Sequence, residues 1–367
     1  MRVLQVTQRY YPYMGGIETH VYEVARRMAA QSVDVTVLST DTSGKLAPRE
    51  TVDGVQIIRV PAYPRQRDFY FSPQIYREIM HGGWDVVHCQ GYHTFVPPVA
   101  MLAAQRSHTP YVLTFHSGGH SSSLRHSSRA LQTSVLRPLL ARANRLIGVS
   151  KFEAALFGQR LGLPPDRFEV IPNGAQLPEI ETPRPRSTTT VLSVGRLEKY
   201  KGHHRLIEAF PFVLKECPQA HLRILGKGAF EAELRQQVEQ LGLQNSVTIS
   251  FVPPEQRAGM AEELQSAALM ILFSEYEAHP VAVMEAAALN CSILVADTSG
   301  LHEIAEQGLA RAIPLESTAQ QIAQAILEQL REPLQPPDFQ LPTWEQCTSS
   351  LLGLYQAVIE ETQPCAL

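Results

Sequence analysis

The stretch AALMILFSEYEAHPVAVMEAAAL, residues 267–289, joins an unbroken apolar run to a proline and a second run that suits a helix. The apolar run, residues 267–273, is typical of a strand buried on both faces of a sheet. Proline fits the first position of a helix well and later positions poorly, so we expect a helix to begin near Pro280. A buried strand that turns into a helix is typical of a parallel α/β sheet.

The same alternation of short apolar runs and longer amphipathic runs covers the chain. Residues 16–31, for example, have apolar side chains at the spacing of one helix face. The pattern predicts an α/β fold with parallel sheets covered by helices on both faces. The predicted strands are residues 2–7, 35–39, 55–60, 85–89, 111–115 and 145–150, followed by 189–195, 221–226, 246–251, 269–274 and 292–297.

The length of 367 residues favours two domains. Residues 172–190 contain four prolines and few large apolar residues, which is typical of a linker. We therefore predict an N-terminal domain over 1–172, a linker over 173–188 and a C-terminal domain over 189–342. A last helix is predicted over 343–362, with Thr343 as its N-cap.

The composition is that of an ordinary globular protein, with 44% hydrophobic residues, 19% charged residues and a formal net charge of −4. This balance argues against a nucleic-acid partner. The cysteines are far apart and form no CxxC pair, which favours a reducing compartment over disulfides or a zinc site. The first residues lack the pattern of a signal peptide, and no window approaches 18 uninterrupted apolar residues. We predict a cytoplasmic protein. The five cysteines are Cys89, Cys217, Cys291, Cys347 and Cys365.

Two glutamates flank the helix predicted to begin near Pro280. In parallel sheets ligands bind at the carboxyl ends of strands, and a helix start without charged residues offers its N–H groups to an anion. Glu285 could therefore accept hydrogen bonds from a ribose and Glu277 from a sugar, on either side of a phosphate. The alternative is a solvated loop glutamate and a helical glutamate that faces water.

The segment SVGRLEKYKGH, residues 193–203, places Arg196 and Lys201 just after a predicted strand. Cations at this position suit a diphosphate and can stabilise the charge that grows as it leaves. The alternative is a helix-initiating turn with two exposed basic side chains. The nearby LGKG, residues 225–228, lacks the spacing of a P-loop, and we interpret it as a structural turn.

Glycines and a histidine mark two further strand ends. Gly15 and Gly16 open the first helix, where a substrate could approach backbone N–H groups, although a glycine pair also forms ordinary tight turns. His116 directly follows the strand 111–115 and could be functional or a packed side chain. No HExxH, GxSxG, P-loop or suitably placed DxD motif occurs, so metal dependence and serine-type hydrolysis lack support.

No acidic residue lies between Asp85 and Glu153, whereas seven basic residues do. Leucines and a valine over 131–140 add an apolar face. A basic amphipathic segment can contact anionic lipid or an acidic acceptor; it can equally be a core-facing helix with solvated arginines, which we favour. The basic residues are Arg106, Arg125, Arg129, Arg137, Arg142, Arg145 and Lys151.

Together, in this order and spacing, these motifs resemble the family-4 retaining glycosyltransferases over nearly the whole chain. Glu277 to Glu285 resembles that family's E-x7-E element, and Gly195-Arg196 with Lys201-Gly202 resembles its GR…KG element. VIPNG, residues 170–174, and the early Gly15-Gly16 agree. The resemblance implies the GT-B fold, two Rossmann-like domains with parallel sheets facing across a cleft, and a last helix that returns to the N-terminal domain.

The resemblance also implies site roles. Arg196 and Lys201 would hold the donor diphosphate, Glu277 would face the donor sugar, and His116 would lie near the reaction centre. The residues expected to bind the rest of the donor are Gly16, Gly195, Phe251, Val252, His279, Pro280, Val281 and Glu285. Three places depart from the family pattern: Ala278-His279 after the first glutamate, Asn290 where glycine is common, and residues 300–315, which keep only the glycine and glutamate of G-x-x-E.

The implied activity is metal-independent transfer, with retention, of a hexosyl group from a nucleotide-diphosphate sugar (UDP or GDP) to a hydroxyl acceptor. The acceptor could be a glycan, a glycolipid or a small molecule, and no cofactor besides the donor is expected. A peripheral contact with the inner membrane face stays open. The alternatives are a sugar-nucleotide epimerase or hydrolase on the same fold and a non-catalytic nucleotide-sugar-binding protein. A two-carboxylate glycoside hydrolase fits less well, because both glutamates flank a helix start beside cations.

Overall fold

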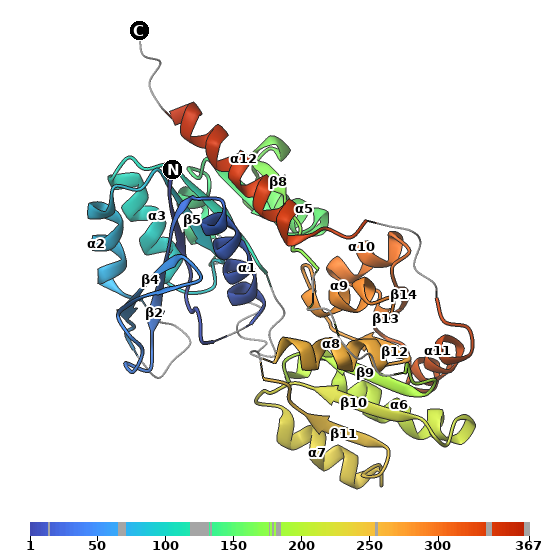
Figure 1. Cartoon of the computed structure of the whole chain (residues 1–367). Helices are drawn as coiled ribbons and strands as arrows, with labels where there is room; N and C mark the ends of the chain where they lie inside the picture. The colour runs from blue at the N-terminus through green and yellow to red at the C-terminus, as the bar shows by residue number, and fades with distance from the viewer. Residues whose placement is uncertain are drawn as a thin grey trace. The chain divides into compact units, whose positions relative to one another are not determined.

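The computed structural model describes residues 1–13, 15–64, 71–117, 132, 134–175, 177, 180, 185–253, 256–334 and 340–362. The chain forms two compact units (Figure 1). The N-terminal unit comprises the described residues of 1–117, 127–174 and 342–367, and the C-terminal unit those of 175–341. Each unit is a mostly parallel sheet with helices on both faces, which confirms the predicted fold class.

The N-terminal sheet has β1 near its centre, and every neighbouring pair is parallel except β3 with β4. Both faces of β1 are buried: Val3 packs with α1 and α12, whereas Leu4 and Val6 pack with α2 and α3 on the other face. The strand order is β3 (Arg49–Val52), β4 (Val55–Pro61), β2 (Asp34–Asp41), β1 (Arg2–Val6), β5 (Val86–Gln90), β6 (Tyr111–Thr114), β7 (Arg145–Gly148) and β8 (Phe168–Val170).

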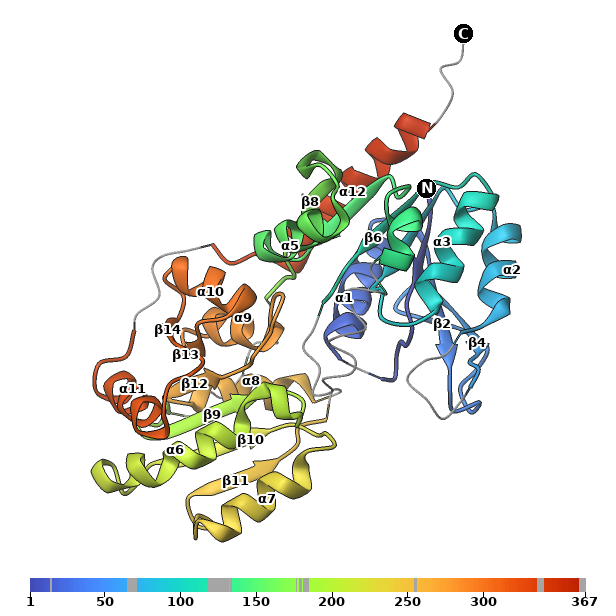
Figure 2. The same ribbon diagram turned by 180° about the vertical axis from the view of Figure 1, so that it is seen from behind.

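Helices cover this sheet on both faces (Figures 1 and 2). Ser150 caps α5 by accepting a hydrogen bond from the Glu153 N–H, and Gly162 ends that helix in the left-handed conformation. The helices of the unit are α1 (Gly16–Ala30), α2 (Pro73–Gly82), α3 (Val96–Arg106), α5 (Lys151–Leu161) and α12 (Trp344–Thr362).

The C-terminal helix α12 lies beside α1 and completes the core of the N-terminal unit. Trp344, Tyr355 and Val358 are buried there. The backbone approaches closely at the start of α12, since a Cβ at Gly174 would lie 2.3 Å from the backbone nitrogen of Trp344. The linker glycine is therefore required by the docking of this helix.

The C-terminal sheet is parallel at every described pairing, and its strands share one hydrophobic core. Its order is β11 (Val247–Ser250), β10 (His221–Leu225), β9 (Thr190–Val194), β12 (Leu269–Leu272), β13 (Ser292–Ala296) and β14 (Arg311–Ile313). Thr318 and Gln321 form a capping box at the last helix of the unit. The helices are α6 (His203–Glu216), α7 (Glu231–Gln240), α8 (Arg257–Ser266), α9 (Val281–Ala288), α10 (Ser299–Glu306) and α11 (Ala319–Arg331).

All eleven predicted strands are present, with ends shifted by one or two residues. The prediction missed β3, β8 and β14, which are short strands at or near sheet edges and have mostly half-buried or exposed residues. Of the predicted basic segment, Arg125, Arg129 and Leu131 lie outside the described residues. Leu136 and Leu140 are buried in the N-terminal core, which supports the core-facing interpretation of that part.

Candidate functional site

The carboxyl edge of the C-terminal sheet gathers the predicted cations and carboxylates. Gly195 and Arg196 follow β9, and Glu277 lies in the connection from β12 to α9. Because β9 and β12 are neighbours in the sheet, their loops lie side by side. The sequence prediction placed these residues in separate motifs, and the fold brings them to one edge.

Lys201 and Glu277 form an ion pair in which the two side chains are 13% and 10% exposed. Arg196 is exposed, and its guanidinium donates a hydrogen bond of 2.7 Å to the hydroxyl of Tyr200. A half-buried ammonium, an exposed guanidinium and a carboxylate thus meet within one loop cluster. Two cations with accessible N–H groups are suited to a diphosphate.

The loop that carries these cations is locked to its neighbours by close backbone contacts. Gly202 has φ +75°, and a Cβ there would lie 2.0 Å from the Phe273 carbonyl oxygen. The buried imidazole of His203 donates from Nε2 to the Arg196 carbonyl at 3.3 Å and accepts from Ser193 at 3.0 Å. Gly195 is different: the nearest atom to a Cβ there would be 3.6 Å away, so its missing side chain leaves its backbone approachable.

The Glu277 backbone is held by α10. Its N–H donates to Ser299 Oγ at 2.8 Å, and its carbonyl accepts from the Gly300 N–H at 2.8 Å. A Cβ at Gly300 would lie 2.0 Å from the Ala278 carbonyl oxygen. The retained glycine of the 300–315 segment therefore supports the carboxylate loop.

Helix α9 begins at Val281 with Pro280 as its N-cap residue, which confirms the helix start expected from the sequence. Its first turn has no acidic residue. His279 is half-buried, its Nδ1 has no hydrogen-bond partner, and burial lowers the pKa of its imidazole to about 4. A neutral histidine at a helix start can hydrogen-bond a ligand without adding charge.

Glu285 is only 4% exposed and forms an ion pair with Arg257 from α8. Reasoning from the sequence missed Arg257, because two residues 28 positions apart on different helices share no local pattern. The pair shows that Glu285 is neither the solvated helical glutamate of the alternative interpretation nor a bare buried carboxylate.

Phe251 and Val252 follow β11, which ends one residue before the predicted strand end, and the Phe251 ring is 38% exposed. Lys227 Nζ lies 3.9 Å from the centroid of that ring, which is a cation–π contact. The glycines of the LGKG turn are structural, as the sequence predicts: Cβ atoms at Gly226 and Gly228 would lie 1.9 and 2.2 Å from backbone oxygens of the 195–197 loop. Lys227 itself was missed.

The remaining predicted residues, Gly16 and His116, belong to the N-terminal unit. Gly16 is the first residue of α1, and a Cβ there would meet nothing within 4 Å. His116 follows β6 with φ +46°, and its Nε2 lies 2.7 Å from Gln90 Oε1. The next N–H, of Ser117, donates at 2.5 Å to the buried carboxylate of Glu153. Neither Gln90 nor Glu153 was predicted.

Burial is the largest cause that holds the pKa of His116 well below its ordinary value, and the neighbouring His20, His88 and His93 add to it. The His20 and His116 rings contact each other edge to face with centroids 4.6 Å apart. The His116 imidazole is therefore neutral at pH 7 and can accept a hydrogen bond or a proton.

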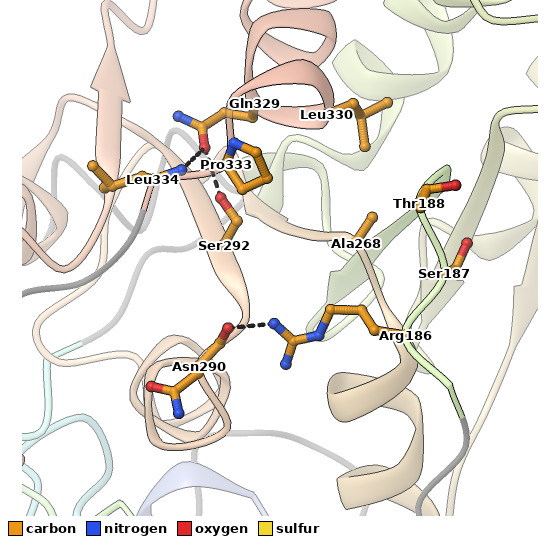
Figure 3. Close-up of a pocket in the computed structure, with 10 residues that line it drawn as sticks. All are labelled: Arg186, Ser187, Thr188, Ala268, Asn290, Ser292, Gln329, Leu330, Pro333 and Leu334. Carbon is orange, nitrogen blue, oxygen red and sulfur yellow. Dashed lines mark hydrogen bonds between the residues drawn. The ribbon is translucent and has the colours of Figure 1, made fainter.

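One cavity lies at the other, amino edge of the C-terminal sheet (Figure 3). Its volume is about 280 Å³, and it contains none of the predicted site residues. The side chain of Arg186 donates to the carbonyls of Leu289 and Asn290, and Gln329 Oε1 accepts from Ser292 at 2.6 Å. These polar groups bond one another across the cavity wall, so we assign the cavity to the scaffold.

Within the described ranges, no group of three or more His, Cys, Asp or Glu side chains could hold a metal ion. The same part of the chain contains no helix that is long and apolar enough to cross a membrane.

Comparison with solved structures identifies the architecture. Sucrose-phosphate synthase (tll1590) from Thermosynechococcus elongatus superposes with a TM-score of 0.72 at 18% identity, covering 98% of this chain and 96% of the other. Anabaena Alr3699/HepE in complex with UDP gives a TM-score of 0.66 at 18% identity, covering 98% of both chains. The protein is therefore of the GT-B type, two parallel-sheet α/β domains.

Sequence comparison identifies the family. The model of Glycosyltransferase Family 4 matches residues 14–177, and that of Glycosyl transferases group 1 matches residues 179–340. The GDP-mannose:cellobiosyl-diphosphopolyprenol alpha-mannosyltransferase of Xanthomonas campestris is 28% identical over 308 residues, 81% of this chain and 79% of that protein. The phosphatidyl-myo-inositol mannosyltransferase of Mycobacterium tuberculosis (strain H37Rv) is 26% identical over 319 residues, 84% and 81% of the two chains. The chain belongs to glycosyltransferase family 4, the glycosyl transferases group 1, and is a glycosyltransferase that uses a nucleotide-sugar donor.

Proposed function

We propose that this glycosyltransferase moves a hexosyl group, with retention and without a metal ion, from a nucleotide-diphosphate hexose to a hydroxyl of a lipid-linked acceptor. The observation that carries the proposal is the cluster of Arg196, Lys201 and Glu277 at the carboxyl edge of β9 and β12. GDP-mannose is the first donor to test, because the similar enzyme of Xanthomonas campestris is named for it.

In the proposed reaction the bond between the anomeric carbon and the β-phosphate oxygen breaks, and a bond from the acceptor oxygen to that carbon forms on the same face. The acceptor proton passes to the leaving phosphate. Arg196 and Lys201 stabilise the negative charge that develops on the diphosphate. In other phosphate-transfer sites metal ions provide this stabilisation. Glu285 binds the ribose hydroxyls, and Glu277 binds the sugar.

The donor displaces one contact in this scheme. Lys201 is paired with Glu277 in the structure, so a bound diphosphate would share or replace that carboxylate as the partner of the ammonium. Glu277 would then be free to accept hydrogen bonds from the sugar hydroxyls. Charge balance thus couples diphosphate binding to sugar binding.

A two-carboxylate hydrolase is disfavoured by the pairing of both glutamates. An acid and nucleophile pair requires one protonated carboxyl and one free carboxylate on either side of a sugar. Here Glu277 is paired with Lys201 and Glu285 with Arg257, so each carboxylate already has a cationic partner.

The direct test incubates the purified enzyme with GDP-mannose, UDP-glucose, UDP-N-acetylglucosamine and ADP-glucose. The acceptors are phosphatidylinositol and a polyprenyl-diphosphate disaccharide, each presented in detergent. Nuclear magnetic resonance of the product reports the anomeric configuration, and a chelator tests metal independence. Retained configuration and full activity in chelator are expected. Donor consumption with release of free or epimerised sugar and no acceptor product would instead identify the hydrolase or epimerase.

Membrane contact is a separate part of the proposal, motivated by the basic segment and by relatives named for lipid-linked acceptors. We expect the protein to float with liposomes that contain anionic lipid and to stay behind with neutral ones. Equal behaviour toward both kinds of vesicle would remove this part and leave the transfer reaction untouched.

A further inference from the structure

His116 has a backbone conformation that needs support from its surroundings. Its φ of +46° lies in the left-handed region, where the side chain of any residue except glycine crowds the following carbonyl oxygen. Such a conformation persists only where neighbouring contacts determine it, and it is most frequent at functional sites. The contacts on either side of His116 therefore decide whether its imidazole keeps its place after β6.

His116 is held through the residues before and after it. Before it, the Phe115 N–H donates to the Ile147 carbonyl of β7 at 3.1 Å. After it, the N–H and the hydroxyl of Ser117 both donate to Glu153 Oε1 at 2.5 Å. The Phe115 contact continues the backbone pairing of β6 with β7, whereas the two Ser117 contacts depend on one side chain. A single substitution at Glu153 can therefore remove the second support.

Glu153 lies in the first turn of α5 and is completely buried. A glutamate at this position commonly accepts a hydrogen bond from the N-cap N–H of its own helix. Here Oε2 accepts instead from the Val149 N–H at 2.9 Å, and Oε1 is occupied by Ser117. Burial raises the pKa of this carboxyl group, and a buried carboxyl is costly unless it is hydrogen-bonded. One of its two oxygens thus serves the residue after His116.

We propose that Glu153 is a positioning residue of the transfer reaction: by holding Ser117 it keeps the His116 backbone left-handed and the imidazole in place beside the reacting sugar. This inference rests on the proposed role of His116 at the substrate. The ring is oriented separately, by the hydrogen bond of 2.7 Å between its Nε2 and the Gln90 side chain. Loss of the Glu153 contacts should therefore move the whole residue, because the ring bond alone does not hold the backbone.

The first experiment is a crystal structure of Glu153→Met, which keeps the length of the side chain and removes both acceptor oxygens. We expect His116 to leave the left-handed region and take a negative φ. A His116 that stays near φ +46° in this variant would overturn the inference. The result does not depend on any enzymatic activity.

The second experiment measures kcat at saturating donor and acceptor. We expect Glu153→Met to lower kcat about tenfold, since a displacement of about 1 Å at a reacting centre can cost up to about a hundredfold. The matched control is Asp41→Leu. Asp41 is also a buried carboxylate of the N-terminal unit, and it accepts from the N–H and hydroxyl of Ser43 and from the Leu46 N–H. Its variant should keep kcat within about twofold and leave His116 left-handed.

The third experiment repeats the substitution without the imidazole. If Glu153 acts through His116, Glu153→Met should not lower kcat further in a His116→Ala enzyme, because the positioned group is already absent. A carboxylate that only stabilises the fold would instead cost the same factor in both backgrounds, and that result would overturn the inference. If Glu153→Met does not fold, Ser117→Ala replaces it. The loss of one hydrogen bond should then lower kcat about threefold in the wild type and not at all in His116→Ala.

The outcomes separate the inference from the proposed function. Equal losses in the two backgrounds, with a wild-type enzyme that transfers sugar, would overturn only the role of Glu153. A His116→Ala enzyme with the wild-type kcat would remove His116 from the reaction and the inference with it, while transfer itself stands. A wild-type enzyme that transfers no sugar to any acceptor would count against both.

Discussion

The two units present their candidate residues at the same kind of place, the carboxyl edge of a parallel sheet, with opposite chemistry. In the C-terminal unit the residues are charged and paired, Lys201 with Glu277 and Arg257 with Glu285. In the N-terminal unit the surroundings of His116 are mainly neutral, namely the Gln90 amide and imidazoles whose pKa values burial holds low, although the carboxylate of Glu153 accepts a hydrogen bond from the neighbouring Ser117. Charged groups suit a diphosphate that leaves with growing charge, whereas neutral groups suit hydroxyls. Under the proposed function, each unit would serve a different part of the reaction.

The role of the charged residues in the C-terminal unit is tested most directly at Lys201. We expect Lys201→Ala to lower kcat by about a hundredfold or more, because one charge-stabilising donor contributes on this order to a transition state. The control is Lys199→Ala, an exposed lysine in the same turn. Rates measured at saturating donor decide the matter. Near-normal turnover of Lys201→Ala would show that the charged residues of the C-terminal unit do not stabilise the leaving diphosphate.

Acid tests whether the buried histidines of the N-terminal unit are neutral. Burial lowers the pKa of His20 to about 4, so the unfolded chain binds a proton there at a higher pH than the folded one. The stability from His20 is therefore complete above about pH 6.5 and is lost as the pH falls toward 4. Between pH 7 and pH 5 we expect His20 alone to remove about 2 kcal/mol from the free energy of unfolding.

Urea unfolding followed by tryptophan fluorescence measures this loss selectively. Both tryptophans of the chain, Trp84 and Trp344, lie in the N-terminal unit. His20→Gln should lose less stability than the wild type over the same pH range. His302→Gln, at an exposed site in the C-terminal unit, should leave the fluorescence transition as acid-sensitive as in the wild type. An unchanged pH dependence in His20→Gln would show that this histidine is not buried neutral.

The smallest expected effect concerns Glu285. Glu285→Gln should raise KM for the donor about tenfold with little change in kcat, since a hydrogen bond to a charged group is worth roughly 1.5–3 kcal/mol and the amide keeps part of it. Glu263→Gln is the matched control, because Glu263 is also a part-buried carboxylate paired with an arginine, Arg223, in the same unit. A fall in kcat with unchanged KM would move Glu285 from donor binding to catalysis.

Most charged residues of the C-terminal site could be predicted from the sequence because their signals are local. An apolar run, Pro280 and a glutamate eight residues from another fall within one strand-to-helix connection, and Arg196 and Lys201 share one loop. Each motif places its residue at a strand end before any tertiary contact is known. The buried strands were found for the same reason, since continuous apolar runs need no partner to be recognised.

In the N-terminal unit Gly16 and His116 were predicted from the sequence, whereas the residues bonded around His116 were not. Gln90 lies 26 positions from His116 and Glu153 lies 36 positions from Ser117, so neither contact has a local signature. Arg257 was missed because its partner lies on another helix, and Lys227 because two glycines around it explained the turn. The short strands β3 and β14 failed for a different reason: few of their side chains are buried, so hydrophobic periodicity is weak.

The return of the chain through α12 has a consequence for synthesis on the ribosome. Residues 1–174 emerge first, yet their unit lacks Leu351, Tyr355 and Val358 until the C-terminal residues are made. The nascent N-terminal unit thus exposes the apolar face of α1 and leaves the amide nitrogen of Gln5 without its partner Tyr355, while the core residues of the C-terminal unit all lie within 175–341. The later-made unit can therefore fold to completion before the earlier one, the reverse of the usual N-to-C order. A nascent chain stalled before Trp344 should accordingly recruit chaperones through its first unit.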